Sequence, residues 1–565
     1  MRINWRIALI WSCFLARLAF YATMLPLWEG YDEWAHFSVI RTMALRGEPL
    51  VAREQPVPRD VALSLELAPV PWELRYLPPP SVTQDVYWNL PTGIRAQREA
   101  SFRAMPRELG REDGPAGLTA YEALQPPLYY WMLAPVTRLM SHSGLGAQVL
   151  AIRWLGIAIA SSIIPLIFGI ARLAFGDDRI ALICAAVVAV MPGLALDVAR
   201  VGNECLAVVL FTLLIWIGLK KVGQVVNLQA DCQSAFPTRA LSPQFVAAFE
   251  SVDSWWPPPA LGFVLGLGLL TKAYFLTAVP PVILLELYVS RNRGARSYLR
   301  ALVPIAIAAA ISGWWYWRNL LTTGTLSGLS EAATLRGMGT LTLLRHASSV
   351  PWGTAIDSIL FSHLYFGGWS SLTVRSWMYH VFYAVIVVAA FGLLRLIRRP
   401  AVWWLIAIYA AFWAGQIYNV LLLYVSKGLP GSMGWYLYAV VAAEAALCAG
   451  GLSQIRRWAP AAGVVLFGLL DLYTVNCVAI PYYTGMIVHK PNGAIAALHL
   501  ANQRVVGLPG AIERLVVYKG NWVSSPLIVG LWMAYTGATL WLIIAPLWLV
   551  KPTPSSRAGP SQTAP

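Results

Sequence analysis

The stretch "RIALIWSCFLARLAFYATMLPLWEGYDEWAHF", residues 6–37, decides the fold. It begins with an apolar run of about twenty residues, which is enough for one helix to cross the hydrocarbon core of a bilayer. The chain then places two carboxylates, Asp32 and Glu33, where it would leave the membrane. His36 follows Asp32 at i+4, so a helix would put both side chains on one face. The stretch therefore predicts a membrane helix that is followed directly by a segment whose acidic and histidine side chains could take part in catalysis.

The composition of the whole chain supports this interpretation. Of 565 residues, 58% are hydrophobic and only 12% are charged, and the mean hydropathy is +0.59. Soluble domains are about 25% charged, so the chain is predicted to be an integral membrane protein. The net charge of +15 fits basic cytoplasmic loops beside anionic lipid better than nucleic-acid binding. The six cysteines form no CxxC pattern, which indicates neither a disulfide framework nor a zinc site.

Apolar segments recur along the chain and predict an all-α polytopic membrane protein with about twelve transmembrane helices. Residues 1–27 are interpreted as an uncleaved first helix, because the apolar run is long for a signal peptide and no cleavage pattern follows. The predicted spans are 6–27, 149–172, 180–197, 203–220, 259–272, 274–290, 299–320, 379–397, 401–424, 434–453, 457–477 and 525–550.

Short basic loops set the predicted orientation. Residues 291–298 and 395–400 are rich in arginine and are expected in the cytoplasm, together with a polar insert at 220–256. The predicted divisions are a first transmembrane helix (1–27), an extracytoplasmic first loop with juxtamembrane helices (28–148), a transmembrane module (149–320), an extracytoplasmic loop (321–378), a C-terminal transmembrane module with an outer loop at 478–524 (379–550) and a disordered cytoplasmic tail (551–565).

The segment 259–290 carries a lysine inside an apolar, glycine-rich run. It is interpreted either as two short helices meeting at Lys272 or as one long helix. An unpaired ammonium at membrane depth is costly, so Lys272 is expected to meet an anion. Arg200 and Arg318 are further cationic candidates on the outer side, although such side chains often only extend to the membrane surface.

The acidic candidates also have a simpler interpretation. Acidic residues stabilise the first turn of a helix, and Asp32 and Glu33 would then only start one. Against this, the pair sits at the membrane surface, where ions are costly, and the helix continues amphipathically, with Trp34, Phe37 and Ile40 able to lie in the interface. In "YEALQPPLYYW", residues 121–131, the two prolines start a helix, and Glu122 and Gln125 would then be incidental.

Taken together, these candidates describe a reactive site at the membrane border. Carboxylates accept protons or hold metal ions, cationic groups hold phosphate, and apolar helices admit a lipid tail. This inventory fits glycosyl transfer from a polyprenyl-phosphate-linked sugar.

Several motifs resemble those of the GT-C superfamily of integral-membrane glycosyltransferases, which includes protein O-mannosyltransferases and lipid A aminoarabinose transferases. They are "DEWAHF" (32–37), "QPPLYY" (125–130, with Gln125 in place of His), "AIRWLGIAIASSIIPLIFGIARLAFGDDR" (151–179), "GLGLLTKAYF" (266–275) and "GWWYWRNLLTTG" (313–324). The likeness covers residues 1 to 325. Further on, "GWYLYAV" (434–440) has Trp435 where the family usually has Arg.

The resemblance implies roles for particular residues. Asp32 would be the catalytic base, with Glu33 as a supporting acid, and transfer would invert the sugar. His36, Glu122, Gln125, Arg200, Lys272 and Arg318 would contact the donor or the acceptor. A divalent cation, Mg²⁺ or Mn²⁺, at Asp32 and Glu33 is an open alternative.

The expected partners are a polyprenyl-phosphate sugar donor, the lipid bilayer and a glycan, lipid or protein acceptor outside a bacterial inner membrane. No nucleic acid is expected. Two other classes stay open, a transporter or flippase of lipid-linked sugars and a non-catalytic envelope scaffold. A transporter would be expected to show internal repeats and charges near the bilayer midplane, and no repeat is visible.

Overall fold

The protein is described here by a computed structural model that covers residues 5–233, 257–291, 298, 299, 301–496, 498 and 500–549. Within these ranges the chain is helical and contains no β-strand. The predicted tail 551–565 and most of the predicted insert 220–256 lie outside the described residues.

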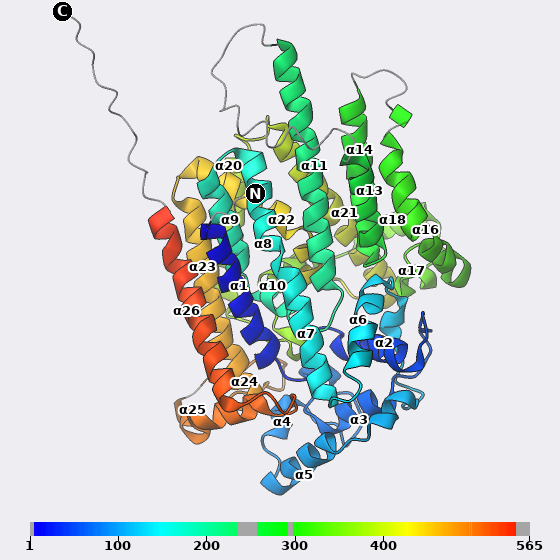
Figure 1. Ribbon diagram of the computed structural model, residues 1–565, viewed down its shortest axis with the longest axis vertical. Coiled ribbons are helices and arrows are strands. Elements are labelled where there is room, and N and C mark those ends of the chain that lie inside the picture. The colour runs from blue at the N-terminus through cyan, green and yellow to red at the C-terminus, as the bar shows by residue number, and fades with distance from the viewer. Residues whose placement is uncertain are drawn as a thin grey trace, which may run out of the picture.

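The long helices run side by side and form a bundle (Figure 1). They are α1 (Trp5–Met24), α7 (Leu145–Ser161), α8 (Ile163–Phe175), α9 (Asp178–Val190), α11 (Glu204–Gln233), α13 (Pro257–Leu269), α14 (Val279–Ser290), α16 (Val303–Thr323), α20 (Ser376–Leu393), α21 (Pro400–Lys427), α22 (Val441–Ile455), α23 (Ala459–Tyr473) and α26 (Ser525–Leu549).

Fewer of these helices qualify as membrane spans than the sequence predicts. Nine segments of the described chain are long and apolar enough to cross a membrane, or ten if the bent pair α9 and α10 (Pro192–Val198) counts as one span. The predicted number of twelve is not confirmed. One reason is that α13 has only 13 residues, and another is that α9 and α10 meet at an angle of 64°. The described chain is thus an all-helical, polytopic membrane protein.

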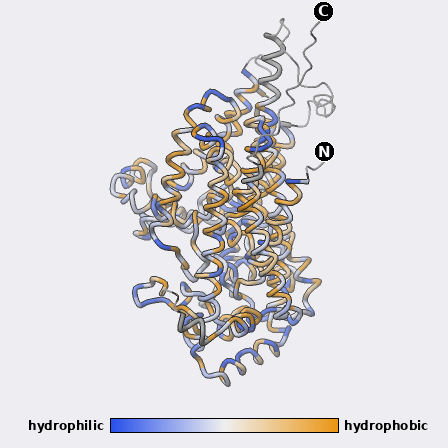
Figure 2. The backbone as a smooth tube through the Cα atoms, turned by 90° about the vertical axis from the view of Figure 1, so that its left-hand side faces the viewer, coloured by the Kyte–Doolittle hydropathy of each residue, from blue (hydrophilic) through white to orange (hydrophobic). Residues whose placement is uncertain are grey.

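The two ends of the bundle differ in their composition. The short helices of the first loop gather at one end together with α24 (Ile480–Tyr483) and α25 (Leu500–Val516), and we call this the loop end (Figure 1). These first-loop helices are α2 (Glu33–Arg46), α3 (Arg59–Leu67), α4 (Gln84–Tyr87), α5 (Thr92–Arg103) and α6 (Leu128–Leu139). The opposite end, which we call the basic end, carries the arginine-rich turn 395–399 that follows α20 (Figure 1). Figure 2 shows the hydrophilic segments concentrated towards the ends and the apolar ones between them.

One helix boundary differs from the predicted one, whereas segment 259–290 agrees with the first of its two interpretations. Helix α11 continues to Gln233, so Lys220 and Lys221 lie inside a helix instead of opening the insert. In segment 259–290, α13 ends at Leu269 and a 3-10 helix, η4 (Ala273–Ala278), leads into α14. The chain therefore has two helices here, with Lys272 in the break between them.

A buried arginine supports the bend between α9 and α10. Pro192 opens α10 and interrupts the helical hydrogen bonding, which frees carbonyl groups inside the bundle. Arg17 of α1 donates to the carbonyl oxygens of Ala189 and Val190. Its guanidinium also pairs with Asp471 of α23 at 2.6 Å, and both side chains are fully buried. This contact joins four helices, because Asp471 also bonds Thr539 of α26.

Candidate functional site

The candidate site lies at the loop end, where several interruptions of the helices meet. These are the α1–α2 connection (25–32), the 3-10 helix η3 (Tyr121–Leu124), the α10–α11 connection (199–203), the break at 270–272 and the 3-10 helix η7 (Gly434–Val440). Non-helical backbone inside a membrane protein persists where the protein satisfies it or where it lines a cavity. We call Asp32, His36, Glu122, Asp197, Arg200, Glu204 and Lys272 the polar cluster.

The break at 270–272 is held by hydrogen bonds to the carbonyl groups of residues 269–271, where α13 ends. The Tyr316 hydroxyl donates to Leu269 at 2.9 Å, the Leu128 N–H to Leu270 at 2.9 Å and the Asn203 amide to Thr271 at 3.0 Å. Three separate elements therefore fix the backbone that carries Lys272.

Asp32 stands at the start of α2 but does not cap it. Its φ is 54°, in the left-handed region, and its side chain makes no capping hydrogen bond. Instead, the Tyr121 hydroxyl donates to Asp32 Oδ1 at 2.5 Å, and the side chain stays partly exposed. Burial raises the pKa of Asp32, while the Tyr121 bond and the charges of Arg200 and Lys272 act in the opposite direction. The carboxylate is thus available for something other than helix capping.

The two cations of the cluster are already paired with acids of the chain. Arg200 contacts Asp197 at 3.0 Å and Glu204 at 2.8 Å, and its side chain is 1% exposed. Lys272 pairs with Glu204 and lies 5.3 Å from the ring centre of Tyr436. The anion that Lys272 meets in this structure is therefore Glu204.

Gly30 allows the α1–α2 connection to approach the side chain of Arg200 closely. A Cβ at Gly30 would overlap the side chain of Arg200. Arg200 also donates to the carbonyl oxygen of Tyr31 at 2.7 Å. The segment that carries Asp32 is thereby held against the α10–α11 connection.

Glu122 and His36 lie beside each other in the interior of the site. His36 Nε2 is 3.6 Å from Glu122 Oε2, and His36 Nδ1 is 2.9 Å from the Tyr130 hydroxyl. The side chain of Gln125 hydrogen-bonds Glu122. Burial and the charge of Asp32 raise the pKa of Glu122 to about 8. Burial, Arg200 and Lys272 lower the pKa of His36 well below its usual value.

Glu33 has an environment unlike that of its neighbour Asp32. Arg153 binds both of its oxygens, with Nε at 2.7 Å and Nη2 at 2.6 Å, and the Val201 N–H donates to Oε1 at 2.9 Å. The side chain is fully buried. This environment argues against the predicted role of a supporting acid, because both oxygens are engaged and water does not reach them.

The remaining predicted residues lie differently from expectation. Arg318 sits 5.0 Å from the ring centre of Trp315 on α16, and in the described part of the chain no ion pair joins it to the polar cluster. Trp34, Phe37 and Ile40 are buried among protein side chains and do not face lipid, because α2 packs against α6 and η3. This corrects the prediction of an interfacial helix.

The structure adds members that the sequence analysis missed. Asp197 and Glu204 bind the two cations, and Tyr121 bonds Asp32. A signal for Asp197 and Glu204 was present in the sequence, since acids within apolar segments are costly and tend to pair with nearby cations.

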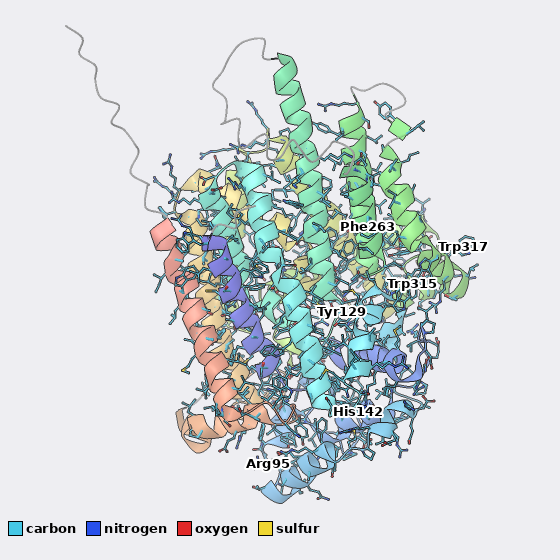
Figure 3. All side chains as sticks on the ribbon, in the orientation of Figure 1. Arg95, Tyr129, His142, Phe263, Trp315 and Trp317 are labelled. Atoms are coloured by element: carbon cyan, nitrogen blue, oxygen red, sulfur yellow. The ribbon has the colours of Figure 1, made fainter. Side chains whose placement is uncertain are left out.

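Of the residues labelled in Figure 3, Tyr129 lies inside the bundle, where its hydroxyl accepts a hydrogen bond from the Gly202 N–H at 3.0 Å. It buttresses the connection that carries Arg200.

The donor set does not fit a divalent cation at Asp32 and Glu33. The oxygens of Glu33 are bound by Arg153 and the Val201 N–H, whereas Asp32 faces Tyr121. Across the described residues, no group of three or more His, Cys, Asp and Glu side chains has an arrangement that could hold a metal ion. We therefore derive no step through a metal.

No protein-family model matches the chain, and no curated protein matches it. Solved structures of the oligosaccharyltransferase of Archaeoglobus fulgidus are distantly similar. The apo form has a TM-score of 0.38 at 13% identity, over 96% of this chain and 56% of that chain. The complex of AglB with an inhibitory peptide and a dolichol-phosphate has 0.36 at 13%, over 96% and 56%. The complex with Zn and sulfate has 0.34 at 12%, over 82% and 51%. This chain thus spans about half the length of those chains, and likeness at this level does not establish a family.

Proposed function

We propose that this protein is an inverting glycosyltransferase of the GT-C type that moves a sugar from a polyprenyl-phosphate-linked donor to an extracytoplasmic acceptor. The observation that carries the proposal is the environment of Asp32. Its carboxylate is partly exposed, caps no helix and accepts a hydrogen bond from Tyr121. It lies within the electrostatic reach of two buried cations at the border of an apolar bundle. The motif "DEWAHF" supports the same role for Asp32.

The proposed reaction is a single displacement. Asp32 removes the proton from the acceptor hydroxyl as the acceptor oxygen bonds to the anomeric carbon of the sugar. The bond from that carbon to the phosphate oxygen breaks, and its electron pair stays on the phosphate. A general base contributes about 10²–10⁴-fold to such a step. Lys272 and Arg200 stabilise the developing negative charge from fixed positions.

The donor would reach the site from the bilayer and the acceptor from the water outside. The lipid tail of the donor remains in the bilayer around the apolar helices, while the sugar-phosphate meets the polar cluster. The acceptor, a glycan, lipid or protein, arrives from outside, and residues 50–120 of the first loop would contact it. We propose a bacterial inner membrane as the location, with the loop end facing the extracytoplasmic side.

The experiment incubates the purified protein with a panel of labelled undecaprenyl-phosphate-linked sugars and an envelope extract as acceptor. Release of undecaprenyl phosphate with transfer of the label is the expected result. Asp32→Asn keeps the shape of the side chain but cannot take a proton, so turnover should fall by about 10² or more. Because Asp32 makes no capping bond, the variant should keep its melting temperature.

The surface variant Asp178→Asn serves as the matched control, since Asp178 forms an exposed pair with Arg172 where α8 and α9 meet, outside the segment proposed to contact the acceptor. Near-parental turnover of Asp32→Asn would refute the assignment of the base. Movement of intact lipid-linked sugar across vesicles without cleavage would favour the transporter. Neither cleavage nor transport with any donor of the panel would favour the scaffold.

A further inference from the structure

We infer that Glu122 is held as the neutral carboxylic acid and donates a hydrogen bond to the phosphate of the lipid-linked donor. The identity of the donor rests on the proposed function, whereas the neutral state of Glu122 does not. Four kinds of observation carry the inference: the charge count of the cluster, the pairing of its cations, the burial of Glu122 and its free oxygen.

The polar cluster holds more acids than bases. Its acids are Asp32, Glu122, Asp197 and Glu204, and its cations are Arg200 and Lys272. Ion pairs join the two cations to Asp197 and Glu204. Asp32 and Glu122 are therefore left without a cation of their own in the described structure, and both cannot ionise cheaply at close range.

The surroundings decide which of the two acids keeps the proton. Asp32 is partly exposed and accepts the Tyr121 hydrogen bond, both of which favour its ionised form. Glu122 is only 9% exposed, and a buried charge without a partner is costly enough that a carboxyl group instead takes up a proton. The environments thus separate the two acids into an ionisable base and a neutral acid, a division that marks acid–base pairs in enzymes.

The charged and titratable groups that face Glu122 act on its pKa in both directions. His36 of α2 lies at 3.6 Å, and its lowered pKa keeps it neutral. Tyr130 of α6 donates to the carbonyl oxygen of Glu122 at 3.1 Å. Arg200 of the α10–α11 connection and Lys272 of the break after α13 lower the pKa of Glu122, and so does the hydrogen bond with Gln125. Asp32 of the α1–α2 connection raises it. Tyr121 directly precedes Glu122 in η3. Burial is the largest influence on Glu122 and the repulsion from Asp32 the next, so the pKa of Glu122 rises to about 8.

One oxygen of Glu122 has no hydrogen-bond partner in the described structure. Glu122 Oε2 is buried and has no hydrogen-bond partner. An ionised carboxylate at this place would repel a phosphate, whereas a protonated one offers an O–H donor. Removal of a single such donor to a developing oxyanion typically costs about 10²–10³ in turnover.

The test compares two substitutions of nearly equal size. Glu122→Gln keeps an N–H donor and cannot ionise, while Glu122→Met keeps the volume and removes the donor. In the parent, release of undecaprenyl phosphate should decline as the pH rises through about 8, because the neutral form exists below the folded-state pKa. Glu122→Gln should stay within about tenfold of the parent at neutral pH. Its alkaline decline should be weaker than that of the parent but not absent, because burial also lowers the pKa of Lys272 to about 8. Glu122→Met should be slower by about 10²–10³.

Two measurements do not depend on turnover. The infrared difference spectrum between the parent and Glu122→Gln at neutral pH should contain the carbonyl band of a protonated carboxylic acid. Binding of undecaprenyl phosphate should weaken more above about pH 8 in the parent than in Glu122→Gln, where Lys272 still loses its charge. Asp178→Asn, the exposed control, should match the parent in both measurements.

The outcomes separate this inference from the proposed function. If Glu122→Gln is as slow as Glu122→Met at every pH, or if the protonated band is missing, Glu122 is ionised and the inference is overturned. If the band and the pH-dependent binding are present but no lipid-linked sugar is cleaved, the proposed function fails while the neutral state of Glu122 stands.

Discussion

Asp32 and Glu33 are adjacent in the sequence, but their carboxylates have different contacts in the structure. The left-handed φ of Asp32 turns its carboxylate towards Tyr121, and Glu33 begins α2 with its carboxylate on Arg153 of α7. A non-glycine residue in this region is uncommon, and such conformations gather at functional sites. The sequence predicted the carboxylate pair, but it could not separate the two roles because Arg153 is 120 residues away along the chain.

A substitution at Glu33 tests its structural role. Glu33→Gln leaves the buried guanidinium of Arg153 without its counter-charge, and breaking one side of a buried pair typically costs about 3–5 kcal/mol. Thermal unfolding in detergent should show a clear loss of stability. Turnover per folded molecule should change much less than in Asp32→Asn.

The exposed Arg59–Glu112 pair gives the comparison, because loss of such a pair costs at most about 1 kcal/mol. A well-folded Glu33→Gln protein with parental stability and no turnover would restore Glu33 to the catalytic role that the resemblance implies.

At the scale of the elements, apolar length predicted where helices occur. The predicted spans 6–27 and 525–550 correspond to α1 (Trp5–Met24) and α26 (Ser525–Leu549) within a few residues. Hydropathy does not distinguish a helix surface that faces lipid from one that faces protein. For this reason the predicted environment of α2 was wrong. The contacts of Asp197 and Glu204 depend on breaks that meet only in three dimensions, so the sequence did not reveal them as parts of the site.

The crossing of α20 and α22 depends on two facing glycines. A Cβ on Gly451 would overlap the carbonyl oxygen of Ala389, and one on Gly392 would overlap the carbonyl oxygen of Gly451. Small residues of this kind let helices approach closely in membranes. Gly451→Ala should therefore push the helices apart and destabilise the protein by about 1–3 kcal/mol.

Gly537 of α26 provides the matched control, because nothing lies within 4 Å of a Cβ built there. Gly537→Ala should be neutral or should stabilise the helix by up to about 1 kcal/mol. Chemical unfolding of both variants in the same detergent makes the comparison. Equal stabilities for the two variants would show that the α20–α22 contact is looser than the structure has it.

The whole molecule has two unlike ends, and this polarity gives the proposed site its direction. The elements of 28–148 and of 478–524 gather at the loop end, and the arginines of 395–399 lie at the other (Figure 1). Arginine in short loops marks the cytoplasmic side, while long loops cross the membrane largely regardless of charge. The polar cluster would then open to the extracytoplasmic side.

Cysteine labelling tests this orientation. In a variant without the native cysteines, Glu108→Cys reports on the first loop and Arg398→Cys on the basic end, since both positions are exposed. A membrane-impermeant thiol reagent should label Glu108→Cys in intact cells and Arg398→Cys only after the cells are opened. The reverse pattern would place Asp32 on the cytoplasmic side, where the arginine-rich loops would face outwards against the usual charge asymmetry. Labelling of both positions from outside would mean that the two ends do not lie on opposite sides of the membrane, and the bundle would then not cross it as its apolar helices imply.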